Sequence, residues 1–304
     1  MRFLVTGASG FIGSRLASYL QRSGHEVLGT IFGAAPVPLP FATRELDILE
    51  AEAVGEVVAA ADPEAILHLA GLSHVGSSWQ RVADYFRINV LGTHNVLRGA
   101  AGRRVVLASS AEVYGLVPES EQPIAESRPL DPRNPYAMSK ASAELLTRDA
   151  GGVVVRSFNL IGPGQADTFA LPSFAKQLAA IERGDAEPVL KIGNLEARRD
   201  FLHVDDALEA YRLVAMEGVA GECYNLGSGE AHSVRELLDV LLAVSGVEAR
   251  AETDPERFRP VDVPENRADI GRLTALGWRP RRGVERALRD LWTSVGDGDG
   301  AAGA

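Results

Sequence analysis

The chain has 304 residues, a formal net charge of −10 and a single cysteine, Cys223. The length allows one large or two modest domains with a substantial core. The acidic balance, without a Lys or Arg cluster, excludes an extended nucleic-acid surface, because such a surface must neutralise phosphates. One cysteine excludes an internal disulfide, and no apolar run approaches the roughly 20 residues that span a bilayer. We therefore expect a cytoplasmic protein with neither nucleic-acid nor membrane partners.

The N-terminal segment combines a strand, a glycine-spaced turn and a helix. A buried strand is predicted over Arg2 to Thr6, and Gly7, Gly10 and Gly13 follow it as G-x-x-G-x-x-G, with a helix beginning near Phe11. Glycines permit a tight turn and close backbone approach, while the helix start favours anionic charge. The pattern predicts a pyrophosphate site; the alternative is a glycine-rich turn without a ligand.

Short strands alternate with Ala-rich helical patterns along the first half of the chain. This alternation predicts an α/β fold, a Rossmann-like doubly wound parallel sheet covered by helices on both faces. Ligands of such sheets bind at the carboxyl ends of the strands, so we expect the segments after the strands to converge on one crevice. The further strands are predicted at Glu26 to Ile31, Ala65 to Leu69, Val105 to Ala108 and Val153 to Arg156; the segments after strands are Gly7, Ala70-Gly71, Ser109-Ser110 and Asn159.

The end of the second predicted strand bears on the choice of cofactor. NAD enzymes place a carboxylate there for the ribose 2′-hydroxyl, whereas NADP enzymes place a basic group near the 2′-phosphate. The segment Gly29 to Gly33 offers neither. Without a carboxylate there is no repulsion against a phosphate, which favours NADP(H), with NAD(H) as the alternative.

A Tyr/Lys pair follows downstream. Asn134-Pro135 is a good helix start, so Tyr136 and Lys140, at i and i+4, are predicted to share one helix face. A phenol has a pKa near 10, and an adjacent ammonium lowers it, which makes the phenol usable for proton transfer. The alternative is a surface Tyr and Lys on an ordinary helix.

After Asn159 the regular alternation of strands and helices gives way to isolated helical stretches. We expect a dinucleotide-binding domain over 1–158, joined by a helix over Asp200 to Ala215 and a strand over Glu222 to Leu226 within 200–228. A smaller mixed α/β substrate-binding domain is expected over 159–199 and 229–293, followed by a disordered tail over 294–304. The histidines have no metal-ligand spacing, so no metal site is expected.

The glycine turn, Ser110 and Tyr136-x-x-x-Lys140 together resemble the extended short-chain dehydrogenase/reductase (SDR) family of NAD(P)-dependent nucleotide-sugar epimerases, dehydratases and reductases. The resemblance covers nearly the whole chain. Within the family, three C-terminal segments are similar to GDP-4-keto-6-deoxy-mannose reductases and to the sister GDP-mannose 4,6-dehydratases: Ser157 to Gln165, Gly193 to Phe201 and Asp254 to Pro260.

The resemblance implies roles for individual residues. Tyr136 would exchange the proton, Lys140 would also bind the nicotinamide ribose, and Ser110 would hydrogen-bond the reacting sugar oxygen. Glu112 is ambiguous, because a dehydratase can use a carboxylate there as a base while reductases also carry an acidic residue. The implied cofactor contacts are Gly7, Gly10, Phe11, Ile12, Gly13, Asp47, Ile48, Leu69, Ala70, Gly71, Asn89, Ser109, Tyr136 and Lys140.

The implied substrate contacts include basic residues suited to a diphosphate, because the arginine fork makes bidentate, charge-assisted bonds. For Arg199, an ion pair with Asp200 or Asp205 is an alternative. The GDP-mannose type is favoured over the dTDP-glucose type of dehydratase, since Ala111 stands where the latter carries an Asp acid. The implied substrate-binding set is Ser110, Tyr136, Asn159, Lys176, Arg199, Arg259 and Asp262.

These residues lead to an expected function in deoxysugar biosynthesis. The main expectation is NAD(P)H-dependent reduction of the C4 ketone of a 4-keto-6-deoxy sugar nucleotide, GDP-linked. The alternatives are a 4,6-dehydratase or 4-epimerase with a tightly bound, recycling cofactor, and a nonenzymatic dinucleotide sensor. By resemblance we also expect a homodimer, formed through helices near Gln80 to Gly99 and Pro135 to Ala150.

Overall fold

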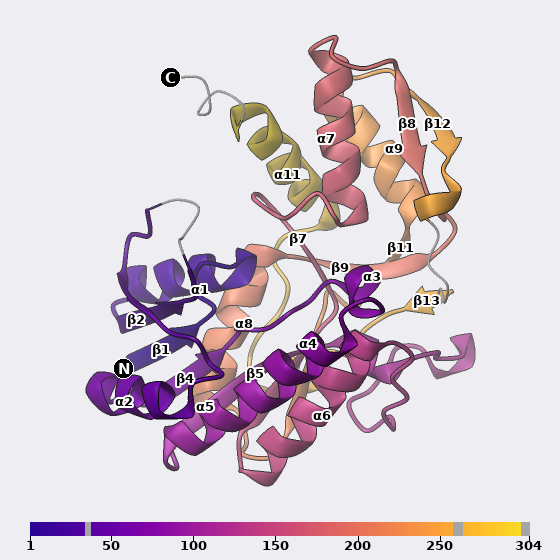
Figure 1. Cartoon of the computed structure of the whole chain (residues 1–304). Helices are drawn as coiled ribbons and strands as arrows, with labels where there is room; N and C mark the ends of the chain where they lie inside the picture. The colour runs from indigo at the N-terminus through magenta and orange to yellow at the C-terminus, as the bar shows by residue number, and fades with distance from the viewer. Residues whose placement is uncertain (34–37, 258–263, 299–304) are drawn as a thin grey trace.

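The protein is described from a computed structural model that covers residues 1–33, 38–257 and 264–298 (Figure 1). Its centre is a seven-stranded parallel sheet with the order β10-β6-β5-β4-β1-β2-β3. The strand order reverses next to β1, as in a doubly wound sheet, which confirms the predicted fold. The strands are β1 (Arg2–Thr6), β2 (Glu26–Ile31), β3 (Ala42–Glu45), β4 (Ala65–His68), β5 (Arg104–Ser110), β6 (Val153–Ser157) and β10 (Cys223–Leu226).

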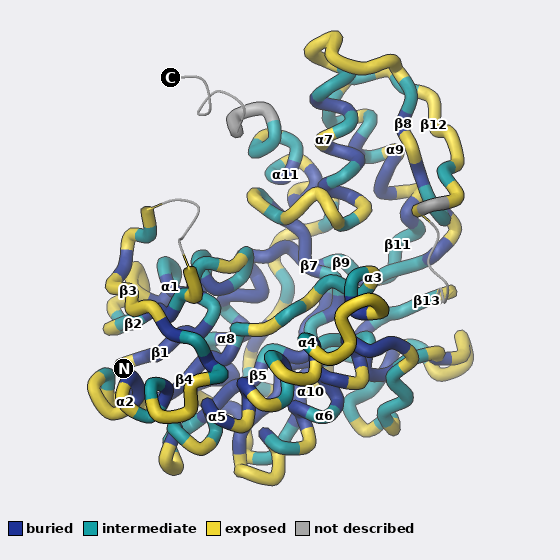
Figure 2. The backbone as a smooth tube through the Cα atoms, viewed as in Figure 1, coloured by how far each residue is buried: buried dark blue, intermediate teal, exposed yellow. Residues whose placement is uncertain are grey.

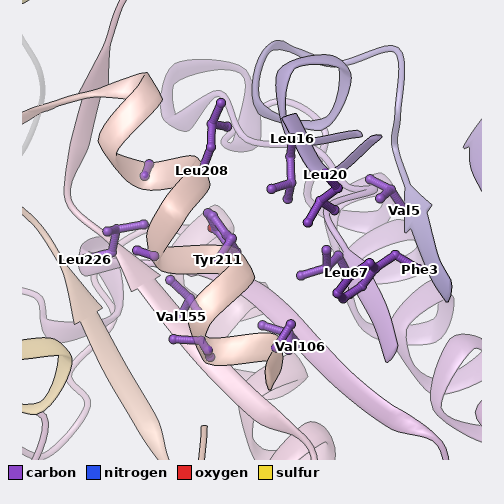
Figure 3. Close-up of a cluster of buried hydrophobic side chains, with 14 of the residues drawn as sticks. Phe3, Val5, Leu16, Leu20, Leu67, Val106, Val155, Leu208, Tyr211 and Leu226 are labelled. Atoms are coloured by element: carbon purple, nitrogen blue, oxygen red, sulfur yellow. The ribbon is translucent and has the colours of Figure 1, made fainter. Parts of the chain in front are cut away.

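Helices cover both faces of this sheet because alternate strand residues point to opposite sides. Phe3 and Val5 of β1 contact Leu16 and Leu20 of α1 on one face, together with Tyr211 of α8 (Figure 3). The inner strands β1, β4, β5 and β6 are largely buried beneath the helices, whereas the edge strand β3 is exposed (Figure 2). The helices on this face are α1 (Phe11–Arg22) and α8 (Val204–Glu217).

The opposite face is built from the intervening strand residues. Leu4 faces this side and joins Val54 of α2 and Val96 of α5, while Leu107 of β5 joins Ala143 of α6. Burying both faces explains why these strands read as continuous apolar runs. The helices on this side are α2 (Ala51–Ala61), α5 (Gly92–Ala100) and α6 (Pro135–Asp149).

A second layer with its own apolar core stands above the carboxyl ends of the strands (Figure 1). It holds a four-stranded sheet, a two-stranded sheet and three long helices, packed around residues such as Leu178, Leu190 and Leu241. Its elements are β7 (Asn159–Ile161), β9 (Arg198–His203), β11 (Ala231–Ser233) and β13 (Glu265–Asn266); β8 (Val189–Ile192) and β12 (Arg250–Thr253); and α7 (Ala170–Glu182), α9 (Val234–Ser245) and α11 (Val284–Gly298).

Short elements connect the two layers and border the strand ends. Among the described residues, no helix is both long enough and apolar enough to cross a membrane. The short elements are α3 (Val75–Ser78), α4 (Val82–Phe86), the π-helix η1 (Arg87–Leu91), the 3₁₀-helices η2 (Ala111–Tyr114), η3 (Glu119–Glu121) and η4 (Pro255–Arg257), and α10 (Gly271–Ala275).

The predicted strands after β2 differ from the observed ones by one or two residues at their ends, and two expected boundaries differ by more. The helix expected over Asp200 to Ala215 begins only at Val204, because residues 198–203 pair as β9 with three other strands and His203 caps the helix. The disorder expected from 294 is wrong for residues 294–298, since α11 continues to Gly298 with Trp292 and Val295 packed on the second core. Residues 299–304 lie outside the described part. The expected domain division stays a prediction.

Candidate active site

The turn after β1 is a cradle that only glycine permits. Gly7 has φ +70, and a Cβ there would lie 2.7 Å from the amide nitrogen of Ala70. A Cβ on Gly13 would lie 2.1 Å from the Gly7 carbonyl oxygen, so the helix sits directly on the turn. Gly10 is the N-cap of α1 and has no side-chain cap, and the first turn holds no acidic residue. The predicted pyrophosphate residues therefore form a compact, uncapped helix start, which suits an anion.

The end of β4 forms the opposite wall of this crevice. A Cβ on Gly71 would lie 2.7 Å from Asn89 Oδ1 and 3.5 Å from Lys140 Nζ. The buried Asn89 carboxamide accepts from the Leu72 amide at 2.8 Å and donates to Ser139 Oγ at 2.9 Å. Asn89 lies in the π-helix η1, an irregularity often found at functional sites. Three predicted cofactor residues from different elements thus meet here.

Asp47 and Ile48 lie farther along the same edge, after β3. Asp47 Oδ1 accepts from the Leu49 amide at 2.9 Å, which fixes the turn before α2. Ile48 is buried against α5, where a Cβ on Gly92 would lie 2.5 Å from its Cδ1. A shallow pocket lined by Phe32, Asp47 and neighbouring residues opens beside them.

Tyr136 stands in the first turn of α6, at the carboxyl end of β5. Asn134 caps this helix by accepting from the Ala137 amide at 2.8 Å, and it donates to Glu112 Oε2 at 3.0 Å. The Tyr136 phenol lies beside the Ser110 side chain, and its ring meets that of Tyr85 edge-on. The predicted catalytic residues Ser110, Tyr136 and Glu112 therefore border one place.

Lys140 lies one helical turn after Tyr136 and is 6% exposed. Its ammonium donates to the carbonyl oxygen of Ala108 at 2.8 Å. Burial lowers the pKa of Lys140 to about 8. The predicted face shared by the two side chains is present, and it points at the end of β5.

The electrostatic balance at Tyr136 differs from the expectation that its pKa falls. Tyr136 is 7% exposed, and burial raises the pKa of its phenol above the ordinary value, while the neighbouring Ser110 side chain opposes this rise. The reason is that the free-energy cost of removing the charged phenolate from water exceeds the stabilisation that neighbouring groups give to it. The phenol therefore keeps its proton at neutral pH.

The predicted substrate residues lie on the strands above the crevice. Asn159 opens β7 and donates to the Asp200 carbonyl at 3.0 Å, and Arg199 lies on the paired strand β9. Arg15 of α1 donates to the Pro163 carbonyl, so the segment after β7 lies against the helix of the glycine turn. Lys176 stands apart on α7, 68% exposed and paired with Asp167 at 2.5 Å. Arg259 and Asp262 lie outside the described residues.

The carboxylates considered as partners of Arg199 have other contacts. Asp200 is fully buried and accepts from the amides of Ser228 at 2.6 Å and Gly229 at 2.9 Å. Asp205 lies 3.8 Å from Arg282. Asp200 therefore holds the loop after β10 against β9.

A buried charged pair lies next to α6, and the sequence analysis does not single it out. Arg156 of β6 donates to Glu144 of α6, and Ser109 donates to the same carboxylate. The available signal was spacing, since Tyr136, Lys140 and Glu144 follow each other at intervals of four.

Histidine has a structural role at the sheet. His68 is buried between Thr6, at 2.7 Å from its Nδ1, and Thr93, at 3.0 Å from its Nε2. Burial and the charge of Lys140 lower its pKa to about 3, so the ring is neutral. Within 1–33, 38–257 and 264–298, no group of three or more His, Cys, Asp or Glu side chains could hold a metal ion.

The chain is similar to known proteins over almost its whole length. The family model described as GDP-mannose 4,6 dehydratase matches residues 4–291. GDP-6-deoxy-D-mannose reductase of Pseudomonas aeruginosa is 37% identical over 302 residues, with 95% of each chain covered. The structure of RMD from Pseudomonas aeruginosa complexed with NADPH has a TM-score of 0.85 at 33% identity, covering 98% of this chain and 99% of that one. UDP-glucose 4-epimerase of Thermus thermophilus, complexed with NAD, has a TM-score of 0.85 at 28% identity, covering 97% and 99%.

Gly13 provides a test of the cradle. We expect Gly13→Ala to destabilise the protein by about 2 kcal/mol, because the new methyl group overpacks against the Gly7 carbonyl. Gly55→Ala in α2 is the matched control: its Cβ meets nothing within 4 Å, so the same change should stabilise the fold by up to about 1 kcal/mol. Thermal unfolding measures both, and equal melting temperatures for Gly13→Ala and the wild type would contradict the described turn.

Proposed function

The chain belongs to the GDP-mannose 4,6 dehydratase family of extended SDR proteins, and from this premise we propose that it reduces the C4 ketone of a 4-keto-6-deoxy sugar nucleotide, with GDP as the nucleotide. It is an NAD(P)-dependent nucleotide-sugar enzyme, as its reductase, dehydratase and epimerase relatives are. A cytoplasmic location stays a prediction.

The observation that carries the proposal is the state of Tyr136 beside Ser110. A reductase needs an acid that still holds its proton when the ketone is reduced; a phenol with an ordinary pKa near 10 is protonated at neutral pH, and burial raises the pKa of Tyr136 further. The similarity to GDP-6-deoxy-D-mannose reductase over 95% of the chain supports the same direction of reaction.

The residues of the crevice fit a nicotinamide dinucleotide. The cradle at Gly7, Gly10 and Gly13 leaves no room for side chains between the turn, α1 and the end of β4, which matches a backbone-lined pyrophosphate site. Gly71 and Lys140 would hold the nicotinamide ribose. When bound, the reduced nicotinamide supplies the hydride that goes to the sugar C4.

The chain supplies the proton and orients the ketone. A sugar carbonyl oxygen between Ser110 and Tyr136 would accept a hydrogen bond from the Ser110 hydroxyl and then the proton of the Tyr136 phenol. The hydride and this proton together convert the ketone to an alcohol. Ser110 is held in place because its Oγ also accepts from the Glu112 amide at 3.2 Å.

The nucleotide end of the substrate would lie along β7 and β9. We assign Asn159 and Arg199 to this end because they stand on paired strands above the crevice. Lys176 could contribute only by leaving its ion pair with Asp167, and Arg259 and Asp262 stay sequence-based assignments. In a chain with net charge −10, such local basic groups are needed to bind a diphosphate.

The second candidate function is a dehydratase or epimerase with a closed redox cycle, in which the bound cofactor is reduced and reoxidised in each turnover. The position of Glu112 favours it. The negative charge of Glu112 faces Tyr136, and the carboxylate is held by Asn134 at 3.0 Å. A dehydratase could use this carboxylate to remove a proton from the sugar. The epimerase relative with NAD belongs to the same class of cycle.

Cofactor consumption separates these functions. We expect the purified enzyme to oxidise one NADPH for each GDP-4-keto-6-deoxy-mannose reduced, followed by absorbance and product analysis. Tyr136→Phe should lower kcat by at least about 100-fold, the usual contribution of a general acid, while the Kd of NADPH stays unchanged. Turnover of GDP-mannose without added NADPH would show that the enzyme runs the closed redox cycle and is not a reductase. If neither protein turns over any substrate and Tyr136→Phe binds NADPH with the Kd of the wild type, the protein is a sensor.

The end of β2 allows a test of cofactor choice. Phe32 follows this strand and is 74% exposed, so replacing it does not disturb the core. We expect Phe32→Asp to weaken NADPH relative to NADH by about tenfold, since the carboxylate repels the 2′-phosphate across partly screened solvent. Phe32→Asn is the control of equal size and should change the ratio little. Fluorescence titration measures both constants; a ratio that Asp and Asn change equally would refute the electrostatic explanation.

We also propose a homodimer through α4, η1 and α6. These helices lie side by side (Figure 1) and present exposed apolar residues: Val82, Phe86, Leu91, Met138 and Leu145. A second copy of this surface would bury them, and exposed apolar residues gathered on one face are typical of such interfaces.

Leu145, 63% exposed, is the residue with which to test this interface. We expect Leu145→Glu to convert the dimer to a monomer, because two added charges would face each other across the two-fold axis. Met216→Glu is the control, since Met216 is 36% exposed and lies on α8, which covers the other face of the central sheet. Sedimentation velocity distinguishes the two forms; a wild-type monomer would reject the dimer.

A further inference from the structure

The end of β5 is bound to one face of α6 through consecutive residues. The Ser110 side chain lies beside the Tyr136 phenol, the Ala108 carbonyl accepts from Lys140, and Ser109 donates to Glu144. On α6 these partners stand at i, i+4 and i+8, so they form a single row. Glu144 is thus the third member of a row whose first two members are the proposed catalytic pair.

Strand register explains why a charged pair forms under this row. Ser109 of β5 lies directly opposite Arg156 of β6 in the parallel ladder. Arg156 donates to Glu144 Oε2 from Nη2 at 2.8 Å and from Nε at 3.0 Å. Arg156 is 2% and Glu144 is 1% exposed. The carboxylate therefore joins two strand ends to the catalytic helix, away from water.

Arg156 is fixed from its other side as well. Its guanidinium carbon lies 4.9 Å from the centre of the Tyr114 ring, and Nη1 donates to the Tyr114 hydroxyl at 2.9 Å. Nη1 also donates to the Glu126 carbonyl at 3.1 Å, and Tyr114 donates to Asn225 at 2.6 Å. These contacts leave Glu144 little freedom to move.

A stabilising role alone does not account for this arrangement. A buried ion pair contributes little net stability compared with apolar side chains of similar volume, because both ions must leave water. The end of β5 needs a different property, namely a fixed position and a negative charge near Lys140.

We propose that Glu144 is a positioning residue for the catalytic pair: it fixes the strand end that carries Ser110 against α6 and supplies the negative charge that faces Lys140. Its kinetic consequence rests on the proposed function, but its effect on dinucleotide binding does not.

The surroundings of Lys140 indicate what removal of this charge does. Burial lowers the pKa of Lys140 to about 8, and Glu144 opposes that shift. His68 on β4 is neutral and cannot replace the charge. The remaining charged or titratable groups around the pair are Tyr136 on α6, Tyr85 on α4, Glu112 on η2, Arg156 on β6 and Tyr211 on α8.

Glu144→Gln is the primary test because it keeps the shape and removes the charge. Lys140 should then lose its proton at lower pH, and only the protonated form has a positive charge for binding the ribose. We expect the pH at which NADPH affinity falls on the basic side to move down by about one unit, the lower end of the effect of one nearby opposite charge. The basic limb of kcat should move with it.

Two further variants keep the test decisive. If Glu144→Gln does not fold, Glu144→Gln combined with Arg156→Met removes both buried charges and should show the same shift. Asp206→Asn is the control: Asp206 is a buried carboxylate on α8 that accepts from Arg282 at 2.5 Å, so its loss should lower stability without moving the pH profile.

The outcomes separate this inference from the proposed function. A folded Glu144 variant whose NADPH titrations coincide with the wild type from pH 6 to pH 9 overturns the positioning role. A wild-type protein that binds NADPH but reduces no keto-sugar nucleotide overturns the proposed function, while the NADPH titrations still test Glu144.

Discussion

The strands of the central sheet all run in the same direction, and this constraint determines the rest of the molecule. Neighbouring parallel strands require a crossover, and each crossover helix must bury one face of the sheet. As a result the ends of β1, β4 and β5 meet at one edge, where the glycine turn, Gly71 and Ser110 gather. The site exists because the sheet is parallel, before any particular side chain is considered.

Burial then decides the chemistry at that edge. The low exposure of Tyr136 and Lys140 raises the pKa of the phenol and lowers the pKa of the ammonium. In each case burial favours the uncharged form of the side chain. A neutral phenol suits proton donation to a sugar oxygen. Burial lowers the pKa of the Lys140 ammonium, and the negative charge of Glu144 on the same helix face opposes this shift.

Hydrogen bonds between side chains and backbone groups join the second layer to the central sheet and its helices. Asp200 accepts backbone amides from the loop after β10, and Arg15 donates to the carbonyl of Pro163 from the glycine-turn helix. These contacts connect the part of the chain that would hold the dinucleotide with the part that would hold the sugar nucleotide. The same arrangement of layers is present in reductase and epimerase structures, so the layers alone do not select one reaction.

Local chemistry made part of this structure readable from the chain alone: β1 and β2 have the predicted bounds, and α6 begins at Pro135 after its Asn134 cap. Glycine spacing, apolar runs and helix caps act over a few residues, so their signals survive in the sequence. The start of α8 and the extent of α11 did not have such signals, and the spacing that places Glu144 on the face of Tyr136 and Lys140 did not indicate Arg156 as its partner. Only the tertiary structure decided them, because strand pairing, packing on the second core and burial depend on residues far apart in the chain.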